Sequence, residues 1–275
     1  MSLLDVAVKA AKQAGNLMEK RMDTDKRVNY KTSSHDLVTE VDQECEKIIR
    51  ETLQASYPDH QVLGEEGVEA GSEASRAALE AAREAEYLWI IDPIDGTTNF
   101  VHRFPFFCVS IGIAHQGEII AGVIFDPVQN ELFVAEKGKG ATLNGERIRV
   151  SQEKTLETSL LATGFPAGIR EARQVNINGI LELGTKCRNI RTAGSAALHL
   201  AYVASGRLTG FWEIDLNAWD LAAGALLVKE AGGRVTDTTG QPYHIGVRNI
   251  LATNGLIHDS VQRTLKDVKA TGFES

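Results

Sequence analysis

The stretch Trp89-Ile90-Ile91-Asp92-Pro93-Ile94-Asp95-Gly96-Thr97-Thr98-Asn99-Phe100 decides how this chain is interpreted. An apolar run over residues 87–91 predicts a short buried strand that ends abruptly at Asp92. Pro93 fixes its own φ angle and has no N–H group to donate, so the chain must leave the sheet there in a defined direction. We therefore expect a strand followed directly by a tight turn.

This turn carries oxygen ligands and backbone amides close together. It can bring the carboxylates of Asp92 and Asp95 beside the exposed carbonyl of Ile94, and hard cations such as Mg²⁺ bind oxygen atoms of this kind. Gly96 allows the backbone to approach a ligand, and the N–H groups of residues 96–98 can open a short helix that points at an anion. Asp-Pro and Asp-Gly pairs are also common in solvated turns, so the rest of the chain must decide between the two interpretations.

The composition argues against partners that carry many negative charges. The 275 residues are 43% hydrophobic and 24% charged, which is enough for one large domain or two lobes. The formal net charge of −8 argues against a nucleic-acid surface and against an anionic membrane partner. An acidic enzyme that acts on a small phosphate ester would need metal ions or a local cationic spot to hold its substrate.

The cysteines and the first residues predict a cytoplasmic protein. Cys45, Cys108 and Cys187 are odd in number and form no Cys-x-x-Cys pair, which fits a reducing cytosol with the thiols as small core residues. Asp5 and Lys9 interrupt the first apolar pattern, so we expect no signal peptide. No uninterrupted apolar run is long enough to span a bilayer.

Hydrophobic periodicity predicts helices packed on an antiparallel sheet in the first half of the chain. One predicted helix covers residues 3–21, and a second begins after its N-cap Thr39 and ends near residue 56. A third, alanine-rich helix at residues 72–86 is expected at the surface without a catalytic role. Predicted strands cover residues 60–63, 107–115, 118–126 and 131–136, and Asn144-Gly145 predicts a hairpin between two more strands.

In the second half, strands and helices alternate as in an α/β layer. The predicted strands cover residues 159–163, 186–190, 208–214 and 249–253. The predicted helices cover residues 171–183, 195–204 and 218–230, and another helix closes the chain. We therefore expect two lobes, residues 1–155 and 156–275, that meet near residue 155 without a separate linker.

Several further acidic residues follow strands or begin helices. Glu65 follows a predicted strand, Glu213 ends another, and Asp220 lies in the first turn of a helix. Some of these acids can be explained by a structural role alone, because the helix dipole favours an acid such as Asp220 at a helix start. Asp42 likewise fits a capping box with Thr39. Taken together with Asp92 and Asp95, these acids suggest a divalent-metal pocket.

The histidines show no comparable pattern. His199 lies between two leucines on an apolar helix and is expected in the core. His35 and His102 have no second histidine at metal-ligand spacing, so they are weak candidates.

At this point the sequence resembles the inositol monophosphatase family. The principal motifs are Gly-Glu65-Glu66, the stretch 89–100, Trp219-Asp220-Leu-Ala-Ala-Gly and Glu230-Ala-Gly-Gly233. Supporting motifs are Asp36-Leu-Val-Thr-Glu-Val-Asp42, Leu161-Ala-Thr-Gly-Phe-Pro166 and Arg191-Thr-Ala-Gly-Ser-Ala-Ala197. The match covers nearly the whole chain.

The resemblance implies an α+β fold of the inositol monophosphatase/fructose-1,6-bisphosphatase type, a layered α-β-α-β-α sandwich. It implies a Mg²⁺-dependent, lithium-sensitive phosphomonoesterase, usually a homodimer, with two to three Mg²⁺ ions per site. Mn²⁺ is an expected substitute, and Li⁺ and Ca²⁺ are expected inhibitors. Inositol monophosphate is the favoured substrate, with fructose 1,6-bisphosphate, 3′-phosphoadenosine 5′-phosphate and histidinol phosphate as alternatives.

Two rivals belong to other classes. One is a regulatory protein that uses the same fold to bind a partner. The other is a metal-dependent nuclease, which the acidic charge and the lack of basic stretches disfavour.

The resemblance also implies roles for individual residues. The first metal would be held by Glu65, Asp92 and the carbonyl of Ile94, the second by Asp92, Asp95 and Asp220, and a weaker third by Glu65 with waters. The pair that orients and deprotonates the attacking water would be Thr97 and Asp42. The phosphate and alcohol parts of the substrate would contact Asp95, Gly96, Thr97, Gly194, Ser195, Ala196, Glu213 and Asp220. The second lobe would thus contribute Glu213, Asp220 and the alcohol pocket.

Two departures from the family pattern stand out. The interval between Glu65 and Asp92 is longer than in many relatives, and we expect the extra helix to alter a surface and not the site. Asp215-Leu216-Asn217 stand where relatives often have glycine and histidine. Because these positions adjoin the expected alcohol pocket, they bear on the choice of substrate.

Overall fold

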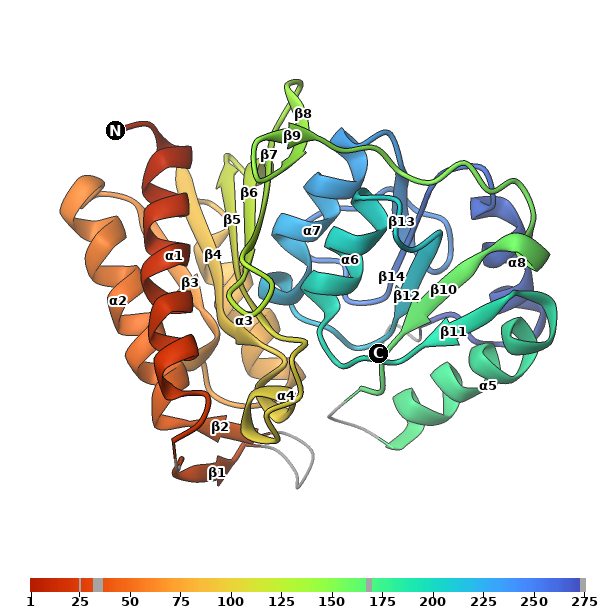
Figure 1. The fold of residues 1–275 in the computed structure, drawn as a ribbon, viewed down its shortest axis with the longest axis horizontal. Helices are drawn as coiled ribbons and strands as arrows, with labels where there is room; N and C mark the ends of the chain where they lie inside the picture. The colour runs from red at the N-terminus through yellow and green to blue at the C-terminus, as the bar shows by residue number, and fades with distance from the viewer. Residues whose placement is uncertain (25, 32–36, 167–169, 273–275) are drawn as a thin grey trace.

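Helices and sheets alternate in five layers in the computed structural model, which describes residues 1–24, 26–31, 37–166 and 170–272. The outer helices are α1 (Leu3–Arg21) and α2 (Glu40–Ser56) on one side and α5 (Arg170–Lys186) and α8 (His258–Asp267) on the other. Between the two sheets lie α6 (Ala196–Ala204) and α7 (Ala218–Glu230) (Figure 1). The predicted layered α-β-α-β-α architecture is confirmed.

The first sheet has seven strands in the order β3-β4-β5-β6-β7-β8-β9. They are β3 (Gln61–Gly64), β4 (Tyr87–Asp95), β5 (Cys108–His115), β6 (Glu118–Asp126), β7 (Glu131–Glu136), β8 (Gly140–Leu143) and β9 (Glu146–Arg147). Neighbouring strands are antiparallel except for β3 and β4. Asn144 and Gly145 both have positive φ angles, as the predicted hairpin between β8 and β9 requires.

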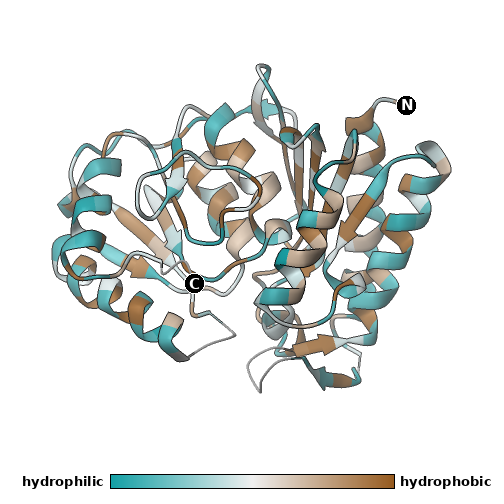
Figure 2. Cartoon of the chain, turned by 180° about the vertical axis from the view of Figure 1, so that it is seen from behind, coloured by the Kyte–Doolittle hydropathy of each residue, from teal (hydrophilic) through white to brown (hydrophobic). Residues whose placement is uncertain are grey.

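Helices α1 and α2 cover the outer face of this sheet, each through one apolar stripe. Both begin with a capping box, formed by Ser2 with Asp5 and by Thr39 with Asp42. Most buried residues of α1 are alanines, which allow the helix backbone to pack close to its neighbours. Figure 2 shows polar residues on the outer sides of the helices and apolar residues on the strands behind them.

The second sheet has five strands in the order β11-β10-β12-β14-β13. They are β10 (Leu160–Thr163), β11 (Asn189–Arg191), β12 (Gly210–Glu213), β13 (Arg234–Asp237) and β14 (Ile250–Thr253). The pairs β11-β10 and β10-β12 are parallel, and the pairs β12-β14 and β14-β13 are antiparallel, so the predicted mixed layer is confirmed. The sequence did not predict β13, and α5 occupies the start of the strand predicted at residues 186–190.

Close packing of α7 on the first sheet positions one of the candidate ligands. A Cβ atom at Gly112 of β5 would lie 2.7 Å from the Cβ of Ala222, and one at Gly122 of β6 would lie 2.8 Å from the carbonyl oxygen of Ala223. Glycine at these two strand positions therefore allows α7 to approach the sheet. This contact holds the first turn of α7, which carries Asp220, near the end of β4.

Some predicted boundaries are wrong. Strand β4 does not end at residue 91 but continues to Asp95, because pairing with β5 resumes after an irregularity. Helix α3 (Ser72–Ala82) ends before residue 86. The remaining elements are β1 (Val28–Tyr30) and β2 (Leu37–Thr39), which were not predicted, together with η1 (Glu65–Gly67), α4 (Thr97–Val101) and η2 (Leu156–Thr158).

The division into lobes 1–155 and 156–275 stays a prediction. The two sheets separate along the chain near that point, but α7 packs against strands of both. Among the described helices, none is both long and apolar enough to cross a membrane.

Candidate active site

Three carboxylates converge where β4 ends and α7 begins. One oxygen atom from each of Asp92, Asp95 and Asp220 lies within 4.8 Å of the other two. Asp92 and Asp95 belong to β4, and Asp220 belongs to the first turn of α7. The fold thus brings together three of the predicted metal ligands from distant parts of the sequence.

An extra residue in β4 explains how two of these aspartates reach the same site. Pairing with β5 places Asp92 opposite Ser110 and Asp95 opposite Cys108, so two residues of β4 oppose one of β5 between these pairs. In a regular strand, residues three apart would point to opposite faces. The bulge brings the second carboxylate back to the side of the first. Inside it, the Ile94 N–H donates to Asp92 Oδ1 at 3.0 Å.

The start of α6 holds the Asp95 carboxylate. Its Oδ2 accepts hydrogen bonds from the Ser195 hydroxyl at 2.5 Å and from the Ala197 N–H at 2.6 Å. Its Oδ1 accepts from the Ala196 N–H at 3.3 Å. The first N–H groups of a helix have no partner within the helix, and the helix dipole favours an anion there. These bonds therefore fix the direction in which Asp95 points.

Two side chains without a predicted role hold the loop before α6. Asn99 Nδ2 donates to the carbonyl oxygens of Ala193 at 2.6 Å and Phe106 at 2.7 Å. His199 Nε2 accepts from the Ala193 N–H at 3.3 Å, and its ring is buried, as expected for a core residue. Gly194, with φ of +85°, then turns the chain into α6. Asn99 stands in the signature stretch, whereas nothing in the sequence signalled the contact of His199.

Asp220 is held in a similar way at the start of α7. Its Oδ2 accepts the Asn217 N–H at 2.6 Å, and Asn217 is the N-cap of the helix. This acid therefore caps a helix and also joins the carboxylate cluster, and its role as a metal ligand stays a prediction.

The Thr97 hydroxyl lies between Asp42 and β4. Its Oγ1 is 2.9 Å from Asp42 Oδ1 and 3.0 Å from the Ile94 carbonyl oxygen, so it can donate to either. The other Asp42 oxygen accepts the N–H and hydroxyl of Thr39 at 2.8 and 2.6 Å, which completes the cap of α2. Burial raises the pKa of Asp42 to about 6, although the bonds from Thr39 and Thr97 act in the opposite direction.

Burial and like charges raise the pKa of the clustered carboxylates. Burial is the largest cause for Asp92, and repulsion from Glu65 and Asp95 comes next; together they raise its pKa well above the ordinary value. Burial and the charge of Asp95 raise the pKa of Asp220 in the same way. The pKa of Asp95 rises to about 6, because burial outweighs the bonds from α6. Burial also raises the pKa of Glu213 well above its ordinary value.

A hard divalent cation fits this group of side chains. The donors are carboxylate oxygens together with the carbonyl oxygen of Ile94, which is the chemistry that Mg²⁺ prefers. A positive ion would also remove the mutual repulsion that raises the pKa of Asp92 and Asp220.

Glu65 lies beside the cluster and is paired with a lysine that the sequence did not single out. Lys31 Nζ is 2.7 Å from Glu65 Oε1 and 2.7 Å from Glu66 Oε1. Burial lowers the pKa of Lys31, but the two glutamates outweigh it and the net direction is upward. Glu65 is not among the three residues whose oxygens lie within 4.8 Å, yet its charge raises the pKa of Asp92.

The carboxylates open into a cleft of about 580 Å³. Of the predicted substrate contacts, the following five line this cleft: Asp95, Gly194, Ala196, Glu213 and Asp220. Ser72 and Ser75 of α3 line it as well. The expectation that this helix affects a surface and not the site is therefore wrong, because side chains at its start reach the cleft.

The cleft also contains the positions where the sequence departs from the family pattern. Asp215 and Asn217 line it, close to Glu213 in the chain. His102 lies on its rim, while His35 and Asp36 fall outside the described residues.

With this geometry in hand, the chain can be compared with known proteins. The model of the inositol monophosphatase family matches residues 1–270. This chain belongs to the inositol monophosphatase family. Its assignment from the sequence motifs is thereby confirmed.

Relatives in this family carry two kinds of name. The chain is 43% identical over 266 residues to Nus factor SuhB of Escherichia coli K12, with 96% of each chain covered. It is 42% identical over 269 residues to inositol monophosphatase 2 of Solanum lycopersicum, with 96% of this chain and 98% of the relative covered. The crystal structure of extragenic suppressor protein suhB from Bartonella henselae superposes with a TM-score of 0.88 at 39% identity, covering 97% of this chain and 99% of that one.

Membership in the inositol monophosphatase family supports a metal-dependent phosphatase, and the carboxylate cluster agrees with that chemistry. The roles of the individual residues stay predictions.

Proposed function

We propose that this protein is a Mg²⁺-dependent phosphomonoesterase that hydrolyses inositol monophosphate to inositol and phosphate. The observation that carries the proposal is the group of the buried Asp92 and Asp95 with the half-buried Asp220, next to the hydrogen-bonded pair of Thr97 and Asp42. A phosphate ester is an anion, and an acidic cleft repels it unless cations reverse the local field.

The proposed metal ligands are Glu65, Asp92, the Ile94 carbonyl, Asp95 and Asp220. Two to three Mg²⁺ ions in this group would activate water and stabilise the negative charge that develops on the reacting oxygens. Mn²⁺ is the expected substitute, and Li⁺ and Ca²⁺ are the expected inhibitors.

The protein's own contribution begins with the Thr97 hydroxyl. It orients the attacking water and passes the water's proton to Asp42, whose pKa of about 6 makes it a suitable acceptor near neutral pH. The N–H groups of Gly96 and Thr97 bind the phosphate oxygens at the start of α4. The leaving alcohol lies toward Gly194, Ser195, Ala196 and Glu213, and its oxygen takes a proton from water.

Other substrates remain in competition because the metal site recognises only the phosphate group. Fructose 1,6-bisphosphate, 3′-phosphoadenosine 5′-phosphate and histidinol phosphate differ in the alcohol part, which would contact Glu213 and the segment Asp215-Leu216-Asn217. The relative named inositol monophosphatase 2 favours inositol monophosphate.

The test is phosphate release from these four substrates, with inositol 1-phosphate as the monophosphate, with and without Mg²⁺ and Li⁺. We expect Mg²⁺-dependent, Li⁺-inhibited turnover and the highest kcat/KM for inositol 1-phosphate. A higher kcat/KM for another substrate would replace inositol monophosphate in the proposal. No turnover of any substrate by folded, Mg²⁺-binding protein would overturn the phosphatase assignment.

A second candidate function is a regulatory binding role, which the relatives named Nus factor SuhB favour. It can be separated from hydrolysis with Asp92→Asn in the organism that encodes the chain. If the binding role is required, the variant strain should grow like the wild type. If hydrolysis is required, it should grow like a strain that lacks the protein.

The proposal also covers assembly and location. We propose a cytoplasmic homodimer that binds neither nucleic acid nor membrane. Light scattering should then give twice the chain mass of 29.9 kDa. Retention of the protein on RNA, DNA or vesicles at physiological salt would contradict this part.

A further inference from the structure

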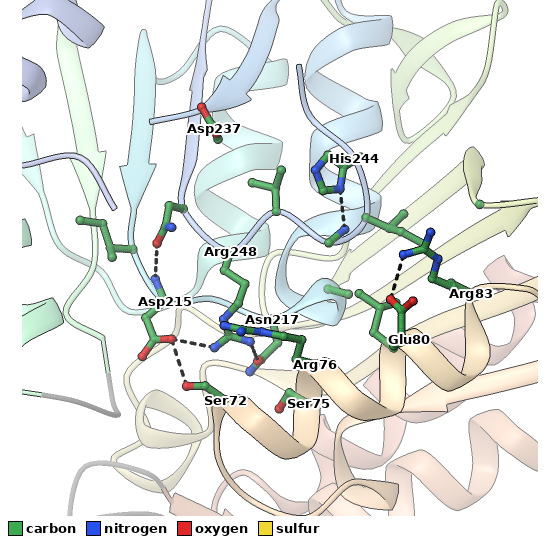
Figure 3. A pocket seen from close by; sticks show the side chains of 18 of the residues that line it. Ser72, Ser75, Arg76, Glu80, Arg83, Asp215, Asn217, Asp237, His244 and Arg248 are labelled. Carbon is green, nitrogen blue, oxygen red and sulfur yellow. Dashed lines mark hydrogen bonds and ion pairs between the residues drawn. The ribbon is translucent and has the colours of Figure 1, made fainter. Parts of the chain in front are cut away.

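A second cavity lies behind the start of α3, on the side of the cleft where the alcohol is expected. Its volume is about 810 Å³, larger than that of the cleft itself. The wall between the two spaces is shared, since both are lined by Ser72, Ser75, Asp215, Asn217 and Arg248. Figure 3 shows this cavity between α3 and the segment that carries His244 and Arg248.

The shared wall is a polar cluster centred on Arg248. Its Nη2 is 2.7 Å from Asp215 Oδ1, and its Nη1 donates to Asn217 Oδ1 at 2.7 Å. Ser72 Oγ donates to the same Asp215 oxygen at 3.1 Å. The side chains of Arg248 and Asp215 are only 15% and 11% exposed. These bonds join side chains alone, so they can rearrange without unfolding a helix or strand.

The charges in this cavity leave one cation without an ionic partner among the described residues. Arg83 is 2.8 Å from Glu80 and 3.6 Å from Glu84, so one positive charge faces two acids at that end of the cavity. Arg248 is balanced by Asp215. Arg76 appears in no ion pair of the described residues, and Figure 3 shows it reaching from α3 toward Arg248.

The remaining acid and histidine of the lining are accounted for by local bonds. Asp237 Oδ1 accepts three hydrogen bonds from residues 239–241, and Asp237 lies away from Arg76 in Figure 3. His244 Nδ1 accepts the Gly246 N–H at 3.1 Å. An anion that enters near Arg76 would therefore meet two guanidinium groups and one carboxylate that is already paired.

We propose that this cavity is a second binding site, for a small organic anion with a phosphate or carboxylate group, and that Arg248 couples it to the metal site. Guanidinium groups bind both kinds of anion through paired N–H donors. Arg76 supplies a guanidinium group that forms no ion pair among the described residues. Arg248 directs part of its N–H donors from Asp215 and Asn217 to the anion.

The coupling runs through Asn217. Arg248 holds the Asn217 side chain, and the Asn217 N–H donates to Asp220, one of the three clustered carboxylates. An anion that draws Arg248 away loosens this cap and weakens cation binding at Asp220. Thermodynamic linkage requires that the cation weakens anion binding by the same factor. This second half of the inference depends on the proposed metal site, whereas anion binding itself does not.

The first experiment uses metal-free protein, so that the anion cannot bind as a ligand of a metal ion in the active site. Calorimetric titration with inorganic phosphate and with malonate should show saturable binding. Arg76→Ala should weaken it about tenfold or more, since it removes a charge-assisted bidentate contact. Arg83→Ala is the matched control, from the end of the same helix and the lining of the same cavity, and should bind like the wild type.

Two outcomes overturn the site: no saturable binding to the wild-type protein, or equal loss in Arg76→Ala and Arg83→Ala. Neither outcome depends on turnover, so the phosphatase proposal can fail or stand independently.

The second experiment measures Mg²⁺ affinity with and without malonate, in wild type and in Arg76→Ala. Malonate also binds Mg²⁺ in solution, and this effect is the same for both proteins, so the comparison with Arg76→Ala removes it. We expect malonate to weaken Mg²⁺ binding about fivefold more in the wild type than in the variant. Equal shifts would refute the coupling. Malonate inhibition that is purely competitive with the phosphate ester and absent in Arg76→Ala would show that the cavity belongs to the substrate site and overturn a separate one.

Discussion

Two charged clusters lie on either side of Asn217, and they are built in opposite ways. In the carboxylate cluster, the buried Asp92 and Asp95 lie close to the half-buried Asp220, and desolvation and mutual repulsion raise the pKa of all three. In the wall cluster, Arg248 faces Asp215, so the charges are matched. Aspartates without a cation thus produce an excess of negative charge in one place, and an aspartate with an arginine forms a neutral pair in the other.

The two clusters should respond differently to the loss of one charge. In a matched pair, losing either member leaves the other buried and uncompensated. A group of like charges lowers the stability of the fold until a counter-ion binds, so such a group fits a binding site better than a structural one. Removing a charge should therefore act in opposite directions on the stability of the two clusters.

The largest expected effect is on turnover in Asp92→Asn. The amide keeps the size of the side chain but removes the charge that two proposed metal sites share, so phosphate release should fall to the background rate. At pH 8, the metal-free variant should unfold at a higher temperature than the metal-free wild type, because repulsion within the cluster decreases.

Thermal unfolding and calorimetric Mg²⁺ titration of the same preparations check this prediction. Substantial Mg²⁺-dependent turnover in Asp92→Asn would remove this residue from the metal site. A lower unfolding temperature would contradict the view that the cluster destabilises the metal-free fold.

Thr97→Ala should have the next largest effect. The substitution removes the hydroxyl that contacts Asp42 and leaves the carboxylates in place, so kcat should fall about 10²-fold with little change in Mg²⁺ affinity. Thr98→Ala, one position along α4, is the matched control and should keep kcat within a small factor. If Thr97→Ala turns over like the wild type, the proton does not pass through this hydroxyl.

The acids themselves could be found from the sequence, because strand ends and helix starts have local signatures. Asp220 was recognised from its place in a helix's first turn, and Asp92 and Asp95 from the end of an apolar run. The bulge that places Asp92 and Asp95 together could not be found, since it depends on where β5 pairs. The apolar pattern indicates which residues are buried but not where strand pairing stops. The strand end predicted from it, at residue 91, is therefore four residues before the end of β4 at Asp95.

Contacts between polar side chains that are distant in the chain could also not be predicted from the sequence. Lys31 stands in a polar loop without periodicity, and its bonds to Glu65 and Glu66 arise only from the fold. Helix α3 was correctly predicted over most of its length, yet its exposed composition hid the contact of Ser72 with Asp215. A polar residue that serves a site and one that faces water look alike in one sequence.

Arg248→Met tests the wall cluster. The substitution keeps the unbranched stem of the side chain but removes the guanidinium group and leaves Asp215 buried without its counter-charge, so the free energy of unfolding should fall by about 3 kcal/mol. Urea denaturation of the metal-free protein measures this change. The opposite sign from Asp92→Asn is the result that distinguishes the two clusters.

The control for this variant is Arg83→Met, in a cation whose ion pair with Glu80 is exposed. Exposed pairs contribute little, so the free energy of unfolding should change by less than about 1 kcal/mol. Equal losses in the two variants would mean that Arg248 contributes through packing and not through its charge.

The smallest effect we expect is a change of Mg²⁺ affinity with pH, which follows from the sign of the pKa shifts. The pKa of Asp95 is about 6 in the folded protein, above its ordinary value of 3.8. Between these values the folded state holds a proton that the unfolded state has released, so the stability of the metal-free protein falls as pH rises through this window. A cation requires the deprotonated carboxylate, and Mg²⁺ affinity must therefore rise over the same range.

For one displaced proton with a pKa of about 6, Mg²⁺ should bind about tenfold more tightly at pH 7 than at pH 5. Calorimetry in two buffers with different ionisation enthalpies gives both the affinity and the number of protons released. Further coupled carboxylates would steepen the dependence, because Asp92 and Asp220 also have raised pKa values. The positive charge of Arg248 lowers the pKa of Asp220, so Arg248→Met should raise that pKa and move the rise in Mg²⁺ affinity toward higher pH. A Mg²⁺ affinity that does not vary between pH 5 and 7 would show that the buried carboxylates are already ionised before the cation arrives.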